Sequence, residues 1–252
     1  MSTTPPAFDY SQYFDEPVRE DLAIGHRRAW ERLALPGTWW TGRERVAIAA
    51  ETRAASTCTF CQKRREALSP FSVQGDHDES TRDILPAAAI DAVHRIVTDP
   101  GRLTEDWVSG LASEGVPITH YVELISVVAS VRSVDGFHRA MGIALEPLPE
   151  PLSGEPSRGR PQAAAPGEAW VPMLPSRRPS GDEADLWNNT TANVIRALSL
   201  VPDAVRWLKE LSAAQYMDDE AITDFARGRG PLSRVQTELV ARQVSAHNEC
   251  FY

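Results

Sequence analysis

Two cysteines spaced C-x-x-C, Cys58 and Cys61, are the residues whose types and spacing most directly indicate chemistry. Thiols at this spacing can close a disulfide within one helical turn, and a helix that begins at the pair favours the thiolate. The chain has one other cysteine, Cys250, close to its C-terminal end. So few cysteines are not typical of a secreted disulfide scaffold. The pair is therefore interpreted as redox-active or metal-binding in a reducing compartment.

Thiol chemistry at this pair needs a lowered pKa and a proton acceptor. The amide groups of a helix start favour negative charge on Cys58, and Lys63, Arg64 and Arg65 follow within two turns. Arg65 is seven residues from Cys58 and therefore lies near the same helix face. The sequence leaves several candidates open for the general base: Glu44, Glu51, His77, Glu123 and His138.

A zinc site is an alternative use of the same pair, and it would need two further ligands. Asp76, His77 and Asp78 could contribute, but two carboxylates and one histidine beside two cysteines form an uncommon ligand set. We therefore expect no metal. His94 lies in an apolar stripe and is interpreted as a hydrogen-bonded core histidine. His26 is expected at the surface or at a subunit contact.

The overall composition excludes several classes of protein. The 252 residues carry a net charge of −9, which argues against nucleic acid as a partner because little would neutralise the phosphates. No apolar stretch approaches about 20 residues, so no membrane span is expected. The N-terminal residues lack the pattern of a signal peptide, and a cytoplasmic protein is predicted. No glycine-rich dinucleotide loop is present, so no NAD, flavin or other cofactor is expected.

Apolar residues recur at helical spacing through most of the chain, and no segment reads convincingly as a strand. The longest apolar run, over 121–141, could also be a buried strand, but its length and helical neighbours favour a helix. The sequence therefore predicts an all-α protein. The expected helices cover residues 22–33, 42–54, 58–68, 84–97, 104–113, 121–141, 192–200, 204–211 and 233–247.

Changes in composition predict four parts of the chain. Residues 1–20 are rich in Pro, Ser, Thr and acids and are expected to form a mobile arm. A first helical domain then covers 21–145. Prolines at short intervals make 146–186 a linker, although Val171, Met173 and Leu174 are apolar enough to pack on a domain surface. A partial second helical unit is expected over 187–252.

Two segments of the chain read alike. Residues 42–61 and 232–252 each have an arginine near the start of a helix that ends in a cysteine. This pattern resembles the alkylhydroperoxidase D-like, or carboxymuconolactone decarboxylase-like, superfamily, with the unit present twice. In the peroxidase branch of that family the motif is E-x11-C-x2-C-x3-H. The resemblance implies a duplicated helical bundle in which two thiols cycle through a disulfide while Glu and His relay the proton.

Neither unit carries the whole family motif. In the first, Val46 stands where the family has glutamate, and Arg65 stands where it has histidine. In the second, Glu238 and Cys250 have the family spacing, but the chain ends before the second cysteine would appear. The second unit is therefore expected to have been cut short.

The resemblance implies a thiol-dependent peroxidase or disulfide oxidoreductase with a small peroxide as substrate. In the family the more C-terminal cysteine attacks, so Cys61 would attack, Cys58 would resolve, and a dithiol reductant protein would reset the pair. Alternatives are a non-catalytic helical oligomer or redox sensor, and a cofactor-free decarboxylase or lyase acting on an organic acid through His and Glu. A homo-oligomer, dimeric or larger, is also implied. The candidate site residues are Cys58, Cys61, Glu51, Arg65, His77, Glu123, Glu238 and Cys250.

Overall fold

A computed structural model describes residues 8–78, 81–189 and 191–247 of the chain. Within these ranges the regular elements are helices, and the only β-type pairing consists of two isolated bridges. The prediction of an all-α protein is therefore confirmed. No helix in the same ranges combines the length and the apolar character that crossing a bilayer requires.

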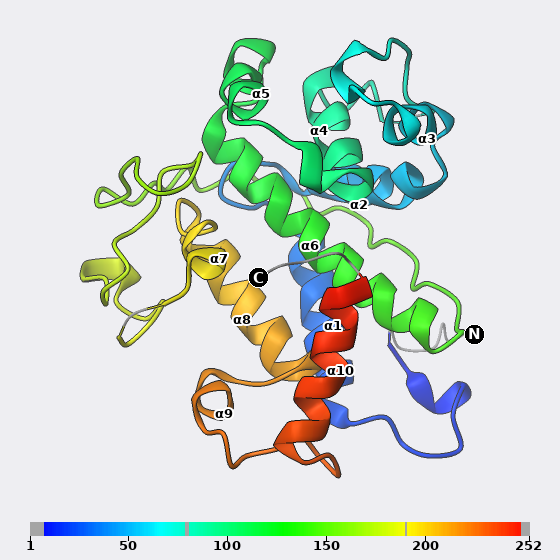
Figure 1. Cartoon of the computed structure of the whole chain (residues 1–252), viewed down its shortest axis with the longest axis vertical. Coiled ribbons are helices and arrows are strands. Elements are labelled where there is room, and N and C mark those ends of the chain that lie inside the picture. Colours follow the sequence, from blue (N-terminus) through cyan, green and yellow to red (C-terminus); the bar gives the residue numbers. More distant parts are fainter. Residues whose placement is uncertain (1–7, 79–80, 190, 248–252) are drawn as a thin grey trace.

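The longest helix, α6 (Ile118–Ala140), runs through the middle of the molecule (Figure 1). It packs against α1 (Glu20–Ala34), α2 (Gly42–Ala54), α4 (Ala87–Thr98) and α8 (Pro202–Gln215). Valines and leucines recur along α6 at helical spacing, and most of them are buried. The run over 121–141 that could have been a strand is therefore helical.

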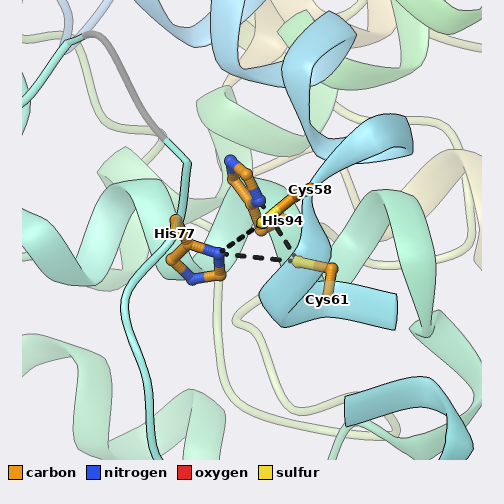
Figure 2. A group of neighbouring side chains, drawn as sticks. All are labelled: Cys58, Cys61, His77 and His94. Atoms are coloured by element: carbon orange, nitrogen blue, oxygen red, sulfur yellow. Dashed lines mark hydrogen bonds between the residues drawn. The ribbon is translucent and has the colours of Figure 1, made fainter. Parts of the chain in front are cut away.

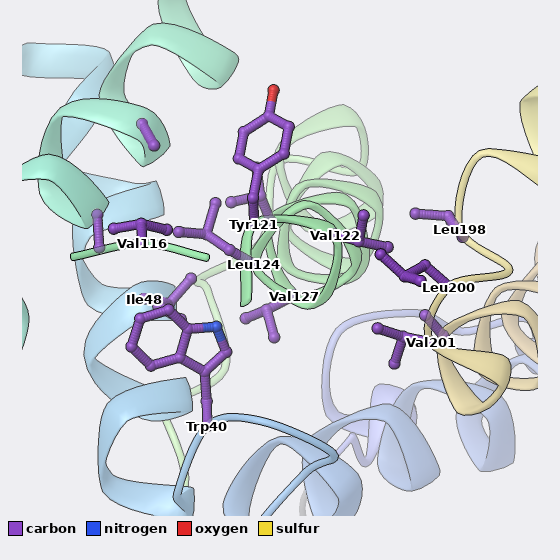
Figure 3. Close-up of a cluster of buried hydrophobic side chains, with 14 of the residues drawn as sticks. Trp40, Ile48, Val116, Tyr121, Val122, Leu124, Val127, Leu198, Leu200 and Val201 are labelled. Carbon is purple, nitrogen blue, oxygen red and sulfur yellow. The ribbon is translucent and has the colours of Figure 1, made fainter. Parts of the chain in front are cut away.

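The main hydrophobic cluster joins both halves of the sequence (Figure 3). Ile48 of α2 and Leu124 of α6 are fully buried in it, together with Leu200 and Val201 just before α8. The segment after the proline-rich region thus shares one core with the segment before it. The other helices are the short α5 (Glu105–Gly110), α7 (Asn193–Arg196) and α9 (Asp219–Thr223), and α10 (Arg234–His247).

Local sequence sets the bounds of the two helices around the cysteine pair. Thr41 and Glu44 form a reciprocal capping box that begins α2. After α2 the chain makes a short 3-10 turn, η2 (Ala55–Thr57), and α3 (Thr59–Glu66) then begins with Cys58 as its N-cap residue. The helix expected over 58–68 is therefore present but slightly shorter, covering Thr59–Glu66.

The N-terminal segment differs from the expected mobile arm in its described part. Phe8 and Tyr10 are only 2% and 4% exposed and pack in a small aromatic cluster with Trp30. The Tyr10 hydroxyl lies 2.5 Å from His26 Nδ1 and 3.1 Å from His138 Nε2. His26 is fully buried, so the expectation of a surface position was wrong. Its hydrogen bond to Tyr10 makes this burial tolerable.

The proline-rich segment runs as an extended strap over the bundle. Its backbone bonds to the turn between α1 and α2, with Leu152 N–H donating to the Ala34 carbonyl and Arg158 N–H to that of Thr38, each at 2.8 Å. Farther along, Met173 is 3% exposed and Leu174 is fully buried. Apolar side chains therefore hold the strap against the helices, as the sequence indicated for this part.

Candidate metal centre

Four side chains meet at one point near α3: Cys58, Cys61, His77 and His94 (Figure 2). Their potential ligand atoms, two sulfurs and two ring nitrogens, all lie within 4.8 Å of one another. The two cysteines and His94 are buried, and the His77 side chain is 9% exposed. Among the described residues, these four form the group of His, Cys, Asp or Glu side chains that lie close enough together to hold a metal ion.

Three separate segments supply these side chains. Cys58 is the N-cap of α3 and Cys61 lies in its first turn, so both sulfurs reach the same side. His94 projects from the middle of α4, which packs against α3. His77 comes from the extended chain after η3 (Pro70–Ser72).

The extended chain is fixed to α3 by the residue after His77. The Asp78 carboxylate accepts hydrogen bonds from the Thr59 N–H at 2.9 Å and from the Thr59 hydroxyl at 3.0 Å. These contacts satisfy a free N–H in the first turn of α3 and place a negative charge at its positive end. Asp78 thus positions His77 over the cysteine pair.

Four distances within the cluster lie close to those of a tetrahedral site. His77 Nδ1 lies 3.6 Å from Cys58 Sγ and 3.5 Å from Cys61 Sγ, and His94 Nδ1 lies 3.2 Å from Cys61 Sγ. The side chains of Cys58 and Cys61 approach to 3.7 Å. Ordinary Zn–S and Zn–N bond lengths in a regular tetrahedron place two sulfurs about 3.8 Å apart and a sulfur and a nitrogen about 3.6 Å apart. The four atoms therefore leave room for one such ion between them.

Each imidazole is oriented by a carboxylate on its far side. His94 Nε2 lies 2.9 Å from Glu51 Oε2, and His77 Nε2 lies 3.0 Å from Asp91 Oδ1. A carboxylate at Nε2 keeps the proton there, which leaves the Nδ1 lone pair directed at the cysteines. Support of this kind is typical of histidines that ligate metals.

The supporting carboxylates are themselves held in place. Glu51 is fully buried and accepts a 2.6 Å hydrogen bond from the Thr81 hydroxyl. Asp91 pairs with Arg64, and Arg95 Nε donates to it at 2.7 Å. Although burial opposes it, hydrogen bonds from His77, Arg64 and Arg95 hold the pKa of Asp91 well below its usual range. Asp91 therefore stays ionised behind His77.

The protein alone does not activate the Cys61 thiol. Burial, with a further contribution from Cys58, raises the pKa of Cys61 to about 12. The sequence-based expectation of a lowered thiol pKa, from the start of α3 and the cations that follow it, was made for Cys58. At Cys61, Arg64 does act in that direction, but desolvation is the larger effect. A bound cation would reverse this balance by stabilising the thiolate directly.

The structure brings some of the predicted site residues together and separates others. Cys58, Cys61 and His77 lie in the cluster, and Glu51 reaches it through His94. Arg65 is exposed and lines a cavity of about 200 Å³ beside Cys61. The cavity lining also includes Ser56, Gln62, Thr98 and Arg132.

The remaining candidates have other partners. Glu123 accepts from the Trp39 N–H at 2.5 Å and lies 3.7 Å from Arg45, so it anchors the turn before α2. Glu238 accepts a hydrogen bond from the Tyr216 hydroxyl and pairs with Arg234, each at 2.7 Å. Cys250 lies outside the described residues.

Two residues that the sequence offered as zinc ligands, Asp76 and Asp78, lie outside the cluster, and a third ligand, His94, was not predicted. Asp76 is exposed and pairs with Arg82, while Asp78 serves as the cap described above. His94, interpreted from the sequence as a core histidine, is buried but faces Cys61. The available signal was its position on the inward face of a helix, since a buried histidine needs partners for both ring nitrogens.

Comparison with family models, with curated proteins and with solved structures gives no match for this chain.

Proposed function

We propose that this protein binds one zinc ion through Cys58, Cys61, His77 and His94. The observation that carries the proposal is that the four ligand atoms lie within 4.8 Å of one another, with sulfur–nitrogen distances of 3.6, 3.5 and 3.2 Å that are close to those around a tetrahedral zinc ion. A set of two thiolates and two imidazoles in this geometry favours zinc over the harder cations calcium and magnesium.

The centre is of the closed type, in which the protein supplies all four ligands and no position is left for substrate. Its role is therefore structural. The hydrophobic cluster around α3 is small, with Cys58, Phe60 and Cys61 as its buried members and Val73 packed against them. A cluster of this size contributes little burial energy, so the metal would fasten α3 and the chain around His77 to α4.

The test is direct measurement of metal in the purified chain. Elemental analysis is expected to give about one zinc per chain, and competition with a chromophoric chelator is expected to give a dissociation constant in the nanomolar range or below. The Cys58→Ser and His94→Gln variants should lose most of this affinity. His120→Gln is the matched control, because His120 contacts Trp39 and Trp40 and lies outside the cluster. Protein that folds and takes up no zinc from excess metal would exclude the proposal.

A second function is favoured by one specific contact, the chain from Glu51 through His94 to Cys61. A carboxylate, an imidazole and a thiol in this order can relay a proton during thiol oxidation. The metal-free protein would then act as the thiol-dependent peroxidase implied by the family resemblance, with Cys61 attacking the peroxide after His94 has taken its proton, a transfer that must offset the burial that raises the pKa of Cys61. Its test is peroxide turnover by metal-free protein with a dithiol reductant. Activity lost in the Cys61→Ser variant would support this function.

A further inference from the structure

We propose that the zinc centre is sensitive to oxidation: a small hydroperoxide oxidises Cys58 and Cys61 to a disulfide, and the zinc ion is released. This inference rests on the proposed zinc site and adds its regulation. It requires that the sulfurs can bond, that an oxidant can reach one of them, and that loss of the thiolates frees the metal.

The two sulfurs lie close enough to bond after a small local movement. The cysteines approach to 3.7 Å, and a disulfide needs about 2 Å. Residues three apart at a helix start have Cα atoms about 5 Å apart, which is within the range for disulfides. Cys58 has an extended backbone with ψ 121°, outside the regular part of α3. The required shift can therefore occur at Cys58 without unwinding the helix.

Cys61 is only 1% exposed, but a cavity that could admit a small oxidant lies beside it. The cavity of about 200 Å³ beside α3 has Cys61 in its lining, together with the polar side chains of Ser56, Gln62 and Thr98. A water molecule takes up about 30 Å³ in the liquid, so the cavity has room for hydrogen peroxide or a small organic hydroperoxide. The polar lining suits such a ligand because its hydroxyl groups need hydrogen-bond partners.

The reaction balances with hydrogen peroxide as the oxidant. The Cys61 thiolate attacks one peroxide oxygen, the O–O bond breaks, and hydroxide leaves and takes up a proton to form water. The Cys58 thiolate then attacks the sulfur of the resulting sulfenic acid, and the second hydroxide leaves as water after taking up another proton. Two thiolates lose two electrons, and one peroxide and two protons yield two waters, one disulfide and free Zn²⁺.

Oxidation would leave His77 and His94 as the only protein ligands, because a disulfide sulfur is a poor donor to zinc. The hydrogen bonds of His77 to Asp91, of Asp78 to Thr59 and of Thr81 to Glu51 would then be among the contacts that still hold this part of the chain. The described part of the stretch from Ala67 to Leu85 contains little buried apolar surface, since Pro70, Thr81 and Leu85 are the buried residues in that part. Release of the metal would therefore loosen this stretch first.

The experiment uses the full chain carrying Cys250→Ser, so that the thiol count reports the pair alone. Zinc-loaded protein is treated with hydrogen peroxide while a chromophoric chelator records free zinc. The expected result is one zinc released for every two thiols lost, with a mass decrease of about 2 Da that a dithiol reverses. Limited proteolysis should show new cleavage between Ala67 and Leu85 after release.

The matched control is Cys58→Asp, which keeps four potential ligands but cannot form the disulfide. It is expected to retain its zinc under the same peroxide treatment, and Cys61→Asp serves in its place should that variant not fold. The inference is overturned when loaded protein keeps its zinc after losing both thiols, or keeps both thiols in excess peroxide. Equal release from the Asp variant also overturns it. These outcomes differ from failure of the proposed function, in which the reduced protein binds no zinc at the start.

Discussion

Replacing Glu51 by glutamine tests whether the carboxylate behind His94 prepares the metal site. Glu51 is fully buried and lies 2.9 Å from His94 Nε2, so the variant keeps the shape of the side chain and removes its charge. Hydrogen bonds to charged groups contribute about 1.5–3 kcal/mol, and neutral ones about 0.5–1.5 kcal/mol. The difference, about 1–1.5 kcal/mol, predicts about a tenfold loss of zinc affinity. This value lies at the lower end of the range for partners of metal-ligating histidines.

The assay is competition for zinc with a chelator of known affinity, at one pH and on folded protein verified by circular dichroism. Glu123→Gln is the matched control, because Glu123 is also fully buried but contacts Arg45 and the turn before α2. Its zinc affinity should stay within about twofold of the parent protein. An unchanged affinity in Glu51→Gln would refute the reasoning. An equal loss in both variants would show that global stability, and not the carboxylate behind His94, sets the affinity.

Three further outcomes are expected. Free zinc at 100 times its dissociation constant should raise the free energy of unfolding by about 2.7 kcal/mol, and a chelator should remove this gain in thermal melts. Burial, with a contribution from His138, lowers the pKa of His26 to about 4 from 6.5. The unfolded chain therefore takes up the proton first, and about 2–3 kcal/mol of stability should be lost between pH 6.5 and 4.5. Urea titrations should show a flatter pH profile for His26→Phe. A Cβ on Gly25 would lie 2.5 Å from that of Ala214, so Gly25→Ala should cost about 1–3 kcal/mol. Gly136→Ala, with open space around it, should not be destabilised, and equal losses in the two variants would contradict the packing argument.

Helix positions followed from the sequence where local signals were strong. Thr41 and Glu44 have the spacing of a capping box, and α2 begins directly after Thr41. The long apolar run predicted α6, and the predicted start at residue 121 lies three residues after the observed start at Ile118. The described part of the N-terminal arm was harder, because Phe8 and Tyr10 are isolated aromatic residues in a polar segment and only the tertiary fold provides their cavity.

The cysteine pair was visible in the sequence, but its surroundings were not. His94 lies 33 positions from Cys61, and nothing in the local pattern links the two. Glu51 and Asp91 support their histidines from two different helices, so the arrangement exists only after α2 and α4 pack. Burial raises the pKa of Cys61, and the sequence could not show this because it reveals nearby cations but not the extent of burial.

The strap has a consequence for the speed of folding. Its hydrogen bonds to Ala34 and Thr38 join positions far apart along the chain. Most helical proteins reach the native state quickly because their contacts are local, whereas distant pairings require closure of a long loop. Docking of the strap should therefore follow assembly of the helices and give this protein a slower final phase than its helical content alone would suggest.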